Sequence, residues 1–126
     1  MKMLICDDDS MTLRALEFQF NKEGFEIIKA CDGRDAMKVM NETDDFDVMI
    51  TDLFMPYISG LELILHARKA LQRSFPIVVV TRANIDDNME QAFEFGADAY
   101  VVKPINLEDI STKINNLLNG ENGENE

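Results

Sequence analysis

The sequence predicts an α/β protein in which five parallel strands alternate with five helices, a (βα)5 arrangement that forms one doubly wound sheet. Two observations carry this prediction: five short apolar runs recur along the chain, and after each of them apolar residues repeat at helical spacing. Continuous runs such as Ile77-Val78-Val79-Val80 suit strands that are buried on both faces. Right-handed crossovers then place helices on both faces of the sheet.

Each strand is expected at an apolar run, and each helix at the apolar face that follows it. In chain order, these pairs are Met3–Cys6 with Leu13, Leu16 and Phe20; Phe25–Ala30 with Ala36, Val39 and Met40; Val48–Asp52 with Leu61, Ile64 and Leu71; Ile77–Thr81 with Ile85, Met89, Ala92 and Phe93; and Tyr100–Lys103 with Leu107, Ile110, Ile114 and Leu117. Ser10, Asp32 and Asn106 are expected to cap helix N-termini, and Gly24 and Gly96 stand where helices should end.

Length and composition predict one intracellular domain. Of the 126 residues, 46% are hydrophobic, which suffices for a single core. We expect the domain to cover residues 1–119 and to be followed by a flexible polar tail over residues 120–126. The chain shows no signal peptide and no apolar run of membrane-spanning length. Cys6 and Cys31 form no metal-binding or disulfide framework, so free thiols in a reducing cytoplasm are expected.

Charge limits the class of partner. The 24 acidic and 12 basic residues give a net charge of -12, which repels nucleic acid and anionic membranes. A basic or peptide-like partner surface is favoured instead.

Polar side chains stand at the carboxyl ends of four predicted strands: Asp7 and Asp8, Asp52, Thr81 and Lys103. Singly, each has an ordinary structural explanation, as a helix cap, a strand residue or a solvated lysine. In an open parallel sheet, however, these ends converge on one crevice. Two carboxylates about 4 Å apart repel by roughly 4 kcal/mol at an effective dielectric near 20, so the cluster needs a cation or a proton.

The chemistry that suits this set is phosphoryl transfer to a carboxylate. Asp52 would be the nucleophile, and Asp8 and Asp52, helped by Asp7 through water, offer the hard oxygen ligands that Mg²⁺ prefers. Thr81 would donate a hydrogen bond and Lys103 a positive charge. Without a Cys/His cluster, a zinc or copper site is not expected.

Short motifs at the strand ends resemble the receiver domain of bacterial two-component response regulators, especially the stand-alone, CheY-like form. They are Leu4-Ile5-Cys6-Asp7-Asp8-Asp9, Asp52-Leu53-Phe54-Met55-Pro56 with Gly60, Val80-Thr81, and Tyr100-Val101-Val102-Lys103-Pro104. The resemblance implies a flavodoxin-like sheet with strand order 2-1-3-4-5.

The resemblance also implies a function. Asp52 would accept a phosphoryl group from the phosphohistidine of a histidine kinase. Asp7, Asp8, Asp52 and the backbone carbonyl of Phe54 would organise Mg²⁺, while Thr81 and Lys103 hold the phosphoryl oxygens. Such a domain is not an enzyme in the usual sense, since it catalyses only its own phosphorylation and dephosphorylation.

Family resemblance further implies a switch formed by Thr81 and Tyr100, with a cis peptide bond between Lys103 and Pro104. Phosphorylation would change the surface of the fourth helix, fifth strand and fifth helix, where a downstream target binds, and the protein would be a monomer or a phosphorylation-dependent homodimer. Two purely structural explanations stay open. Tyr100 could be a half-exposed strand tyrosine, and Pro104 could simply open the last helix.

Four positions depart from the family pattern. Arg82 stands where a small residue is usual, and Ile105 replaces a common aromatic residue. Phe54 and Ala83 are apolar at positions from which a polar side chain can place the hydrolytic water. We therefore predict slow autodephosphorylation.

Three other functions compete with the switch. The protein could be a relay that passes its phosphate to another histidine protein, a small Mg²⁺-dependent phosphohydrolase, or a flavodoxin-like cofactor carrier. A chain of 126 residues leaves no room for a substrate-covering cap domain, which disfavours the hydrolase. The acidic run Asp7-Asp8-Asp9 replaces a phosphate-cradling glycine-rich loop, which disfavours the carrier.

Overall fold

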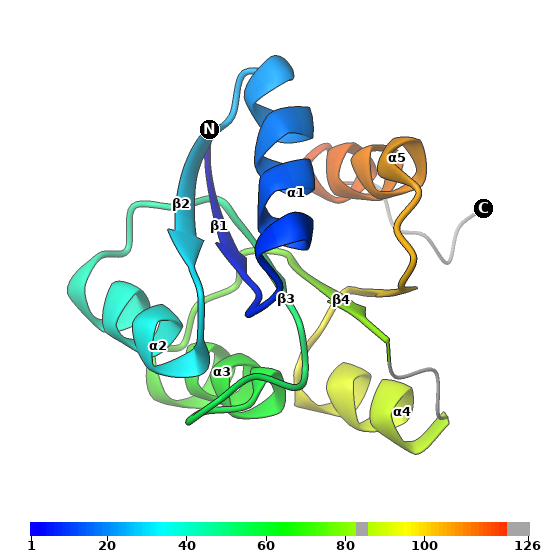
Figure 1. The fold of residues 1–126 in the computed structure, drawn as a ribbon. Coiled ribbons are helices and arrows are strands. Elements are labelled where there is room, and N and C mark those ends of the chain that lie inside the picture. The colour runs from blue at the N-terminus through cyan, green and yellow to red at the C-terminus, as the bar shows by residue number, and fades with distance from the viewer. Residues whose placement is uncertain (83–85, 121–126) are drawn as a thin grey trace.

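The predicted doubly wound sheet is confirmed by the computed structural model, which describes residues 1–82 and 86–120 (Figure 1). All strand pairs are parallel, and the strand order is β2-β1-β3-β4-β5. The elements in chain order are β1 (Lys2–Cys6), α1 (Ser10–Lys22), β2 (Glu26–Ala30), α2 (Gly33–Glu42), β3 (Val48–Thr51), α3 (Gly60–Leu65), the π-helical turn η1 (His66–Ala70), β4 (Ile77–Thr81), α4 (Asp86–Phe95), β5 (Ala99–Val102) and α5 (Leu107–Leu118).

Helices cover both faces of the sheet: α1 and α5 lie on one side, and α2, α3 and α4 on the other (Figure 1). Side chains of β1 alternate between the two resulting cores. Met3 and Ile5 pack with α1 and α5, whereas Leu4 and Cys6 pack toward α2 and α3. Burial on both faces explains why this strand is an unbroken apolar run.

Strand bounds differ slightly from the sequence-based prediction. β2 begins at Glu26, one residue late, because the Phe25 N–H donates back to the Phe20 carbonyl and its ring packs edge-on against Phe20. β3 ends at Thr51, which leaves Asp52 in the loop that follows. β5 covers Ala99–Val102, one residue earlier than predicted.

The cap of α1 was predicted incorrectly. Asp9, not Ser10, is the N-cap: its backbone is extended, and its carboxylate accepts hydrogen bonds from the Met11 N–H at 3.1 Å and the Thr12 hydroxyl at 2.8 Å. Ser10 is already the first helical residue. A free carboxylate that can reach two donors is a better cap than the next hydroxyl, so the helix starts one residue after Asp9.

Other helix ends agree with the prediction. Asp32 and Asn106 cap α2 and α5 by accepting backbone N–H groups of the first turn. Gly24 follows α1 with a φ of 93°, and Gly96 follows α4 with a φ of 121°, both in the left-handed region that favours glycine.

The predicted apolar face of α4 is only partly buried. Ala92 is fully buried, but the Phe93 side chain is 43% exposed and lies beside Tyr100, with ring centroids 6.5 Å apart. Phe95 packs against the core instead. Ile85, which also belongs to the predicted face, lies outside the described residues.

No helix in the described ranges is both long and apolar enough to span a bilayer.

Arg68, in the π-helical turn η1, ties together three parts of the chain. Its guanidinium donates to the carbonyls of Gly96 at 3.0 Å and Arg73 at 2.9 Å, and to the Asp98 carboxylate at 3.0 Å. Asp98 in turn accepts the Ile77 N–H at 2.8 Å. These bonds fix the start of β4 and the α4–β5 connection against η1, at the edge of the sheet from which β4 and β5 begin.

Candidate functional site

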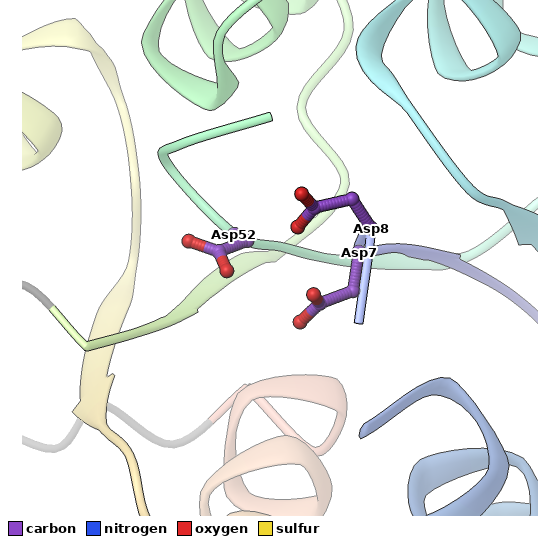
Figure 2. A group of neighbouring side chains, drawn as sticks. All are labelled: Asp7, Asp8 and Asp52. Carbon is purple, nitrogen blue, oxygen red and sulfur yellow. The ribbon is translucent and has the colours of Figure 1, made fainter. Parts of the chain in front are cut away.

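Three carboxylates gather where β1 and β3 end (Figure 2). Asp7 and Asp8 follow β1, and Asp52 follows β3, its neighbour in the sheet, in which Cys6 pairs with Thr51. One oxygen from each carboxylate lies within 4.8 Å of the others. The convergence that the sequence predicted at this edge is therefore present.

Lys103 lies between two of these acids. Its Nζ is 3.0 Å from Oδ2 of Asp7 and 3.0 Å from Oδ2 of Asp52. The backbone N–H of Lys103 donates to the Thr81 carbonyl at 2.8 Å, which holds the residue beside the end of β4. The peptide bond from Lys103 to Pro104 is cis.

Burial sets the electrostatics of the cluster. Counted over the whole residue, Asp7 is 1% and Asp52 is 6% exposed to solvent, whereas Asp8 is an exposed residue. Burial raises the pKa of Asp7 above its ordinary value, although the Asp9 N–H and the Lys103 ammonium act in the opposite direction. Burial would lower the pKa of Lys103, but the hydrogen bonds to Asp7 and Asp52 outweigh it and raise that pKa. One ammonium thus only partly offsets the crowded carboxylates.

Backbone contacts fix Asp52. Its Oδ1 accepts the Phe54 N–H at 3.2 Å, and its carbonyl accepts the Thr51 hydroxyl at 2.9 Å. The Gly60 N–H donates to the Leu53 carbonyl at 2.9 Å, which closes the loop after β3. A Cβ at Gly60 would overlap the carbonyl of Asp52, so only glycine allows α3 to begin this close to the acid.

The cluster opens into a hollow of about 380 Å³. The hollow is lined by Asp8, Asp9, Asp52, Phe54, Thr81, Arg82 and Lys103. Asp7 is not part of this lining and contacts Lys103 from a buried position. Thr81, at the end of β4, does reach the hollow, as the sequence predicted for this strand end.

Two predicted residues stand apart from the cluster. Phe54 contributes its N–H to Asp52, and its side chain is 59% exposed at the rim; the metal-ligand role of its carbonyl stays a prediction. Tyr100 is half-buried beside Phe93 and does not line the hollow. Burial and then the charge of Asp52 raise the pKa of Tyr100.

Two further residues line the hollow without a predicted role there: Asp9, which the sequence showed only as part of an acidic run, and Arg82, which it showed as a departure from the family pattern. Asp9 supports the cluster through its N–H, which donates to Oδ1 of Asp7 at 2.9 Å. The role of Asp9 as the N-cap of α1 could have been predicted, because an Asp just before a segment of helically spaced apolar residues is a common N-cap. Arg82 was recognised in the sequence as unusual at its position, but no sequence signal records the direction of its exposed side chain.

Mg²⁺ fits the residues present. Three carboxylates supply hard oxygen donors, and Lys103 does not fully offset their charge, so a divalent cation would relieve the remaining repulsion. In the described part of the chain, this is the one group of at least three His, Cys, Asp or Glu side chains whose ligand atoms come so close together.

Comparisons with known proteins agree with this geometry. The family model of the response regulator receiver domain matches residues 3–115. The transcriptional regulatory protein PrrA of Mycobacterium leprae is 34% identical over 118 residues, which cover 93% of this chain and 49% of PrrA. The chain thus spans about half the length of such curated relatives.

Solved structures show the same fold. A CheY-like receiver domain protein from Methanospirillum hungatei JF-1 is 32% identical with a TM-score of 0.85, and the match covers 94% of each chain. A response regulator from Burkholderia pseudomallei, described with a phosphorylated aspartic acid, a calcium ion and citrate, is 27% identical with a TM-score of 0.82 over 94% of this chain and 69% of that one. The chain belongs to the response regulator receiver domain family of two-component signalling systems.

Proposed function

We propose that the chain is a cytoplasmic, phosphorylation-dependent switch in which Asp52 accepts a phosphoryl group from the phosphohistidine of a histidine kinase. The observation that carries this proposal is the position of Lys103, whose Nζ lies 3.0 Å from the carboxylates of both Asp7 and Asp52. Lys103 and Asp52 both line the hollow. The ammonium of Lys103 would therefore attract the negatively charged oxygens of a phosphoryl group that approaches Asp52.

In the proposed reaction, an oxygen of the Asp52 carboxylate attacks phosphorus, and the bond from phosphorus to the leaving group breaks. The leaving group, an imidazole nitrogen of the donor histidine or a carboxylate of an acyl phosphate, keeps the electron pair. Lys103 and Thr81 would neutralise and orient the phosphoryl oxygens. Mg²⁺, held by Asp7, Asp8, Asp52 and the predicted Phe54 carbonyl, would supply further charge neutralisation when bound.

The chain's own residues prepare Asp52 for this role. The Phe54 N–H and the Lys103 ammonium bind different oxygens of its carboxylate, so the side chain is held in one orientation. A carboxylate held in this way presents its oxygens to phosphorus in a fixed geometry, as a nucleophile requires. Autocatalysis would then consist of positioning and charge neutralisation, without turnover of an external substrate.

Thr81 and Tyr100 are proposed to transmit the change. Thr81 lines the hollow at the end of β4, and Tyr100 lies on the adjacent strand β5, half-buried beside Phe93 of α4. A shift of Thr81 toward the phosphoryl group would leave room for Tyr100 to move inward. The surface of α4, β5 and α5 would then change its affinity for a downstream target protein or effector domain, or for a second copy of the chain.

We assign this function to residues 1–119, with residues 120–126 as a tail outside the switch. The strongly acidic charge of -12 argues against direct binding of nucleic acid by this domain.

Intact-mass measurement tests the proposal. The full chain is incubated with Mg²⁺ and acetyl phosphate, beside Asp52→Asn, a chelator control and Asp44→Asn, which removes an exposed acid elsewhere. Wild type and Asp44→Asn should gain one phosphoryl group, and the other two samples should gain none. Equal labelling of Asp52→Asn, or no labelling of wild type, would refute the proposal.

A further inference from the structure

Arg82 is an arginine at the boundary between two hollows on the surface of the chain. It follows β4 directly, is exposed, and lines the hollow that contains Asp52. It also lines a second hollow of about 670 Å³, whose walls are mostly apolar. The two hollows share Asp9, Arg82 and Lys103. Arg82 therefore stands at the boundary through which a molecule outside the site would reach the acceptor.

The charges that line the inner hollow make this position important. Three of its side chains are acidic, namely Asp8, Asp9 and Asp52. Its two cations are Lys103 and Arg82. The Lys103 ammonium is already held by Asp7 and Asp52, and its side chain is only 8% exposed. None of the ion pairs between described residues involves Arg82.

An anionic donor must approach this acidic rim from solvent. The whole chain carries a net charge of -12, so the long-range field opposes such an approach. An exposed guanidinium that forms no ion pair with the described residues can bind phosphoryl oxygens through two parallel N–H groups. It can do so without first breaking an existing salt bridge.

We propose that Arg82 is a donor-binding residue, which captures the phosphoryl group of small anionic phosphodonors such as acyl phosphates and delivers it to Asp52. This inference rests on the proposed function and assigns a role to a residue that the general scheme leaves unused. With acetyl phosphate, the Asp52 carboxylate forms the new bond to phosphorus, the bond from phosphorus to the acetyl oxygen breaks, and acetate leaves with the electron pair.

Charge capture is distinguishable from a simple steric effect. A side chain that merely blocks the hollow should slow phosphorylation, and any smaller residue should speed it up. A cation that binds the donor should instead lower KM for acetyl phosphate, with little effect on the maximal rate. Arg82→Met removes the charge and keeps most of the length, Arg82→Lys keeps the charge, and Arg82→Ala removes both.

Initial rates of phosphorylation, measured at a series of acetyl phosphate concentrations, test the proposal. Arg82→Met and Arg82→Ala should raise KM by about three- to tenfold, the effect expected of one charge acting on a dianion at about 6 Å in a water-like, partly screened medium. Arg82→Lys should restore most of the wild-type KM. Lys38→Met, which removes an exposed charge on α2, should leave KM unchanged and controls for net charge.

Ionic strength gives a second test. Added salt should slow wild type more than Arg82→Met, because screening weakens the attraction that only wild type retains. The proposal is overturned if Arg82→Met and Arg82→Ala react as fast as wild type or faster, or if Lys38→Met matches Arg82→Met. If wild type takes up no phosphoryl group even at saturating acetyl phosphate, the proposed function itself has failed.

Binding without reaction can be followed by NMR in the absence of Mg²⁺. The probe is inorganic phosphate, titrated into the full chain while the arginine Nε–Hε resonances are recorded. The Arg82 resonance, assigned by its absence from Arg82→Lys, should shift saturably. A resonance that stays unchanged at phosphate concentrations that shift backbone amides of the site would overturn the proposal. This readout does not depend on phosphoryl transfer to Asp52.

Discussion

Lys103 forms equal 3.0 Å contacts with Asp52 and with Asp7, and so joins the end of β5 to the ends of β3 and β1. Three strands that are not consecutive in the chain are connected through one ammonium group. The contact is nearly closed to solvent, with side-chain exposures of 8% for Lys103, 9% for Asp52 and 2% for Asp7.

Replacing Lys103 with Met should destabilise the metal-free chain by about 3 kcal/mol, because two buried carboxylates lose their cation. The loss should shrink as the pH falls and Asp7, whose pKa burial raises, takes up a proton. Urea unfolding at several pH values measures it. Lys29→Met, which breaks an exposed pair with Glu17, is the matched control and should cost under about 1 kcal/mol. If the two variants lost the same free energy of unfolding, burial would not make the Lys103 contact more stabilising than an exposed ion pair.

Mg²⁺ should raise the melting temperature of wild type, and Asp8→Asn should abolish most of that rise. At a Mg²⁺ concentration ten times the Kd, binding adds about 1.4 kcal/mol of stability. Asp8 is exposed and is one of three crowded acids, so its replacement should leave the metal-free melting temperature unchanged or slightly raised. Thermal unfolding with and without Mg²⁺ checks both statements, with Asp44→Asn as the control. A full Mg²⁺ response in Asp8→Asn would remove this residue from the ligand set.

Phe54→Asn should shorten the lifetime of the phosphorylated chain by about threefold to tenfold, because an amide at this rim can hold a water near Asp52 and the exposed phenyl ring cannot. Loss of the phosphorylated mass after removal of donor measures the decay. Phe18→Asn, at an exposed phenylalanine on α1, serves as control. Ala83→Glu is a second variant with the same expected direction, at a position outside the described residues. Unchanged decay in Phe54→Asn and Ala83→Glu would contradict the prediction of slow autodephosphorylation.

Glu23 should give the stability of the α1–α5 contact a pH dependence. Its carboxylate accepts the Ser111 hydroxyl at 2.6 Å and the Asn115 amide at 3.1 Å. Burial would raise the pKa of Glu23, but the hydrogen bonds from Ser111, Gln19 and Asn115 outweigh it and lower that pKa below its ordinary value. The stabilisation is therefore complete above the ordinary value and is lost as the pH falls through the lowered pKa.

Glu23→Gln should accordingly cost about 0.5–1 kcal/mol at pH 7, with the difference from wild type vanishing at strongly acidic pH. Chemical denaturation across this pH range makes the comparison, and Glu94→Gln on the exposed face of α4 controls for the loss of one charge. A difference that persists unchanged into acid would mean that the ionised carboxylate is not what stabilises the contact.

Much of this structure could be predicted because its signals are local. Continuous apolar runs indicated the strands, and the rule that strand ends converge brought Asp7, Asp8 and Asp52 together. The predicted cap of α1 was wrong because Asp9 and Ser10 are both good caps, and only the backbone conformation after β1 decides between them. The exposure of Phe93 depends on how α4 turns against the sheet, which the periodicity of apolar residues does not record.

Long-range contacts were the least predictable. The hydrogen bonds of Arg68 join the π-helical turn η1 to residues about 30 positions later in the chain. No sequence pattern indicates which arginine will bind such distant groups. Arg82 was recognised as unusual at its position, but its place between two hollows follows only from the packing of α1 and the loop after β5 around it.

The central place of β1 bears on the order of events during protein synthesis. β1 is paired on both sides, with β2 and with β3, so one flank of β1 stays open until Val48–Thr51 have been made. A nascent chain shorter than that already contains Asp7 and Asp8 but lacks Asp52, the third acid of the cluster. The cluster with its ammonium is complete only after Lys103, which follows β5, has been made, because its Nζ contacts both Asp7 and Asp52.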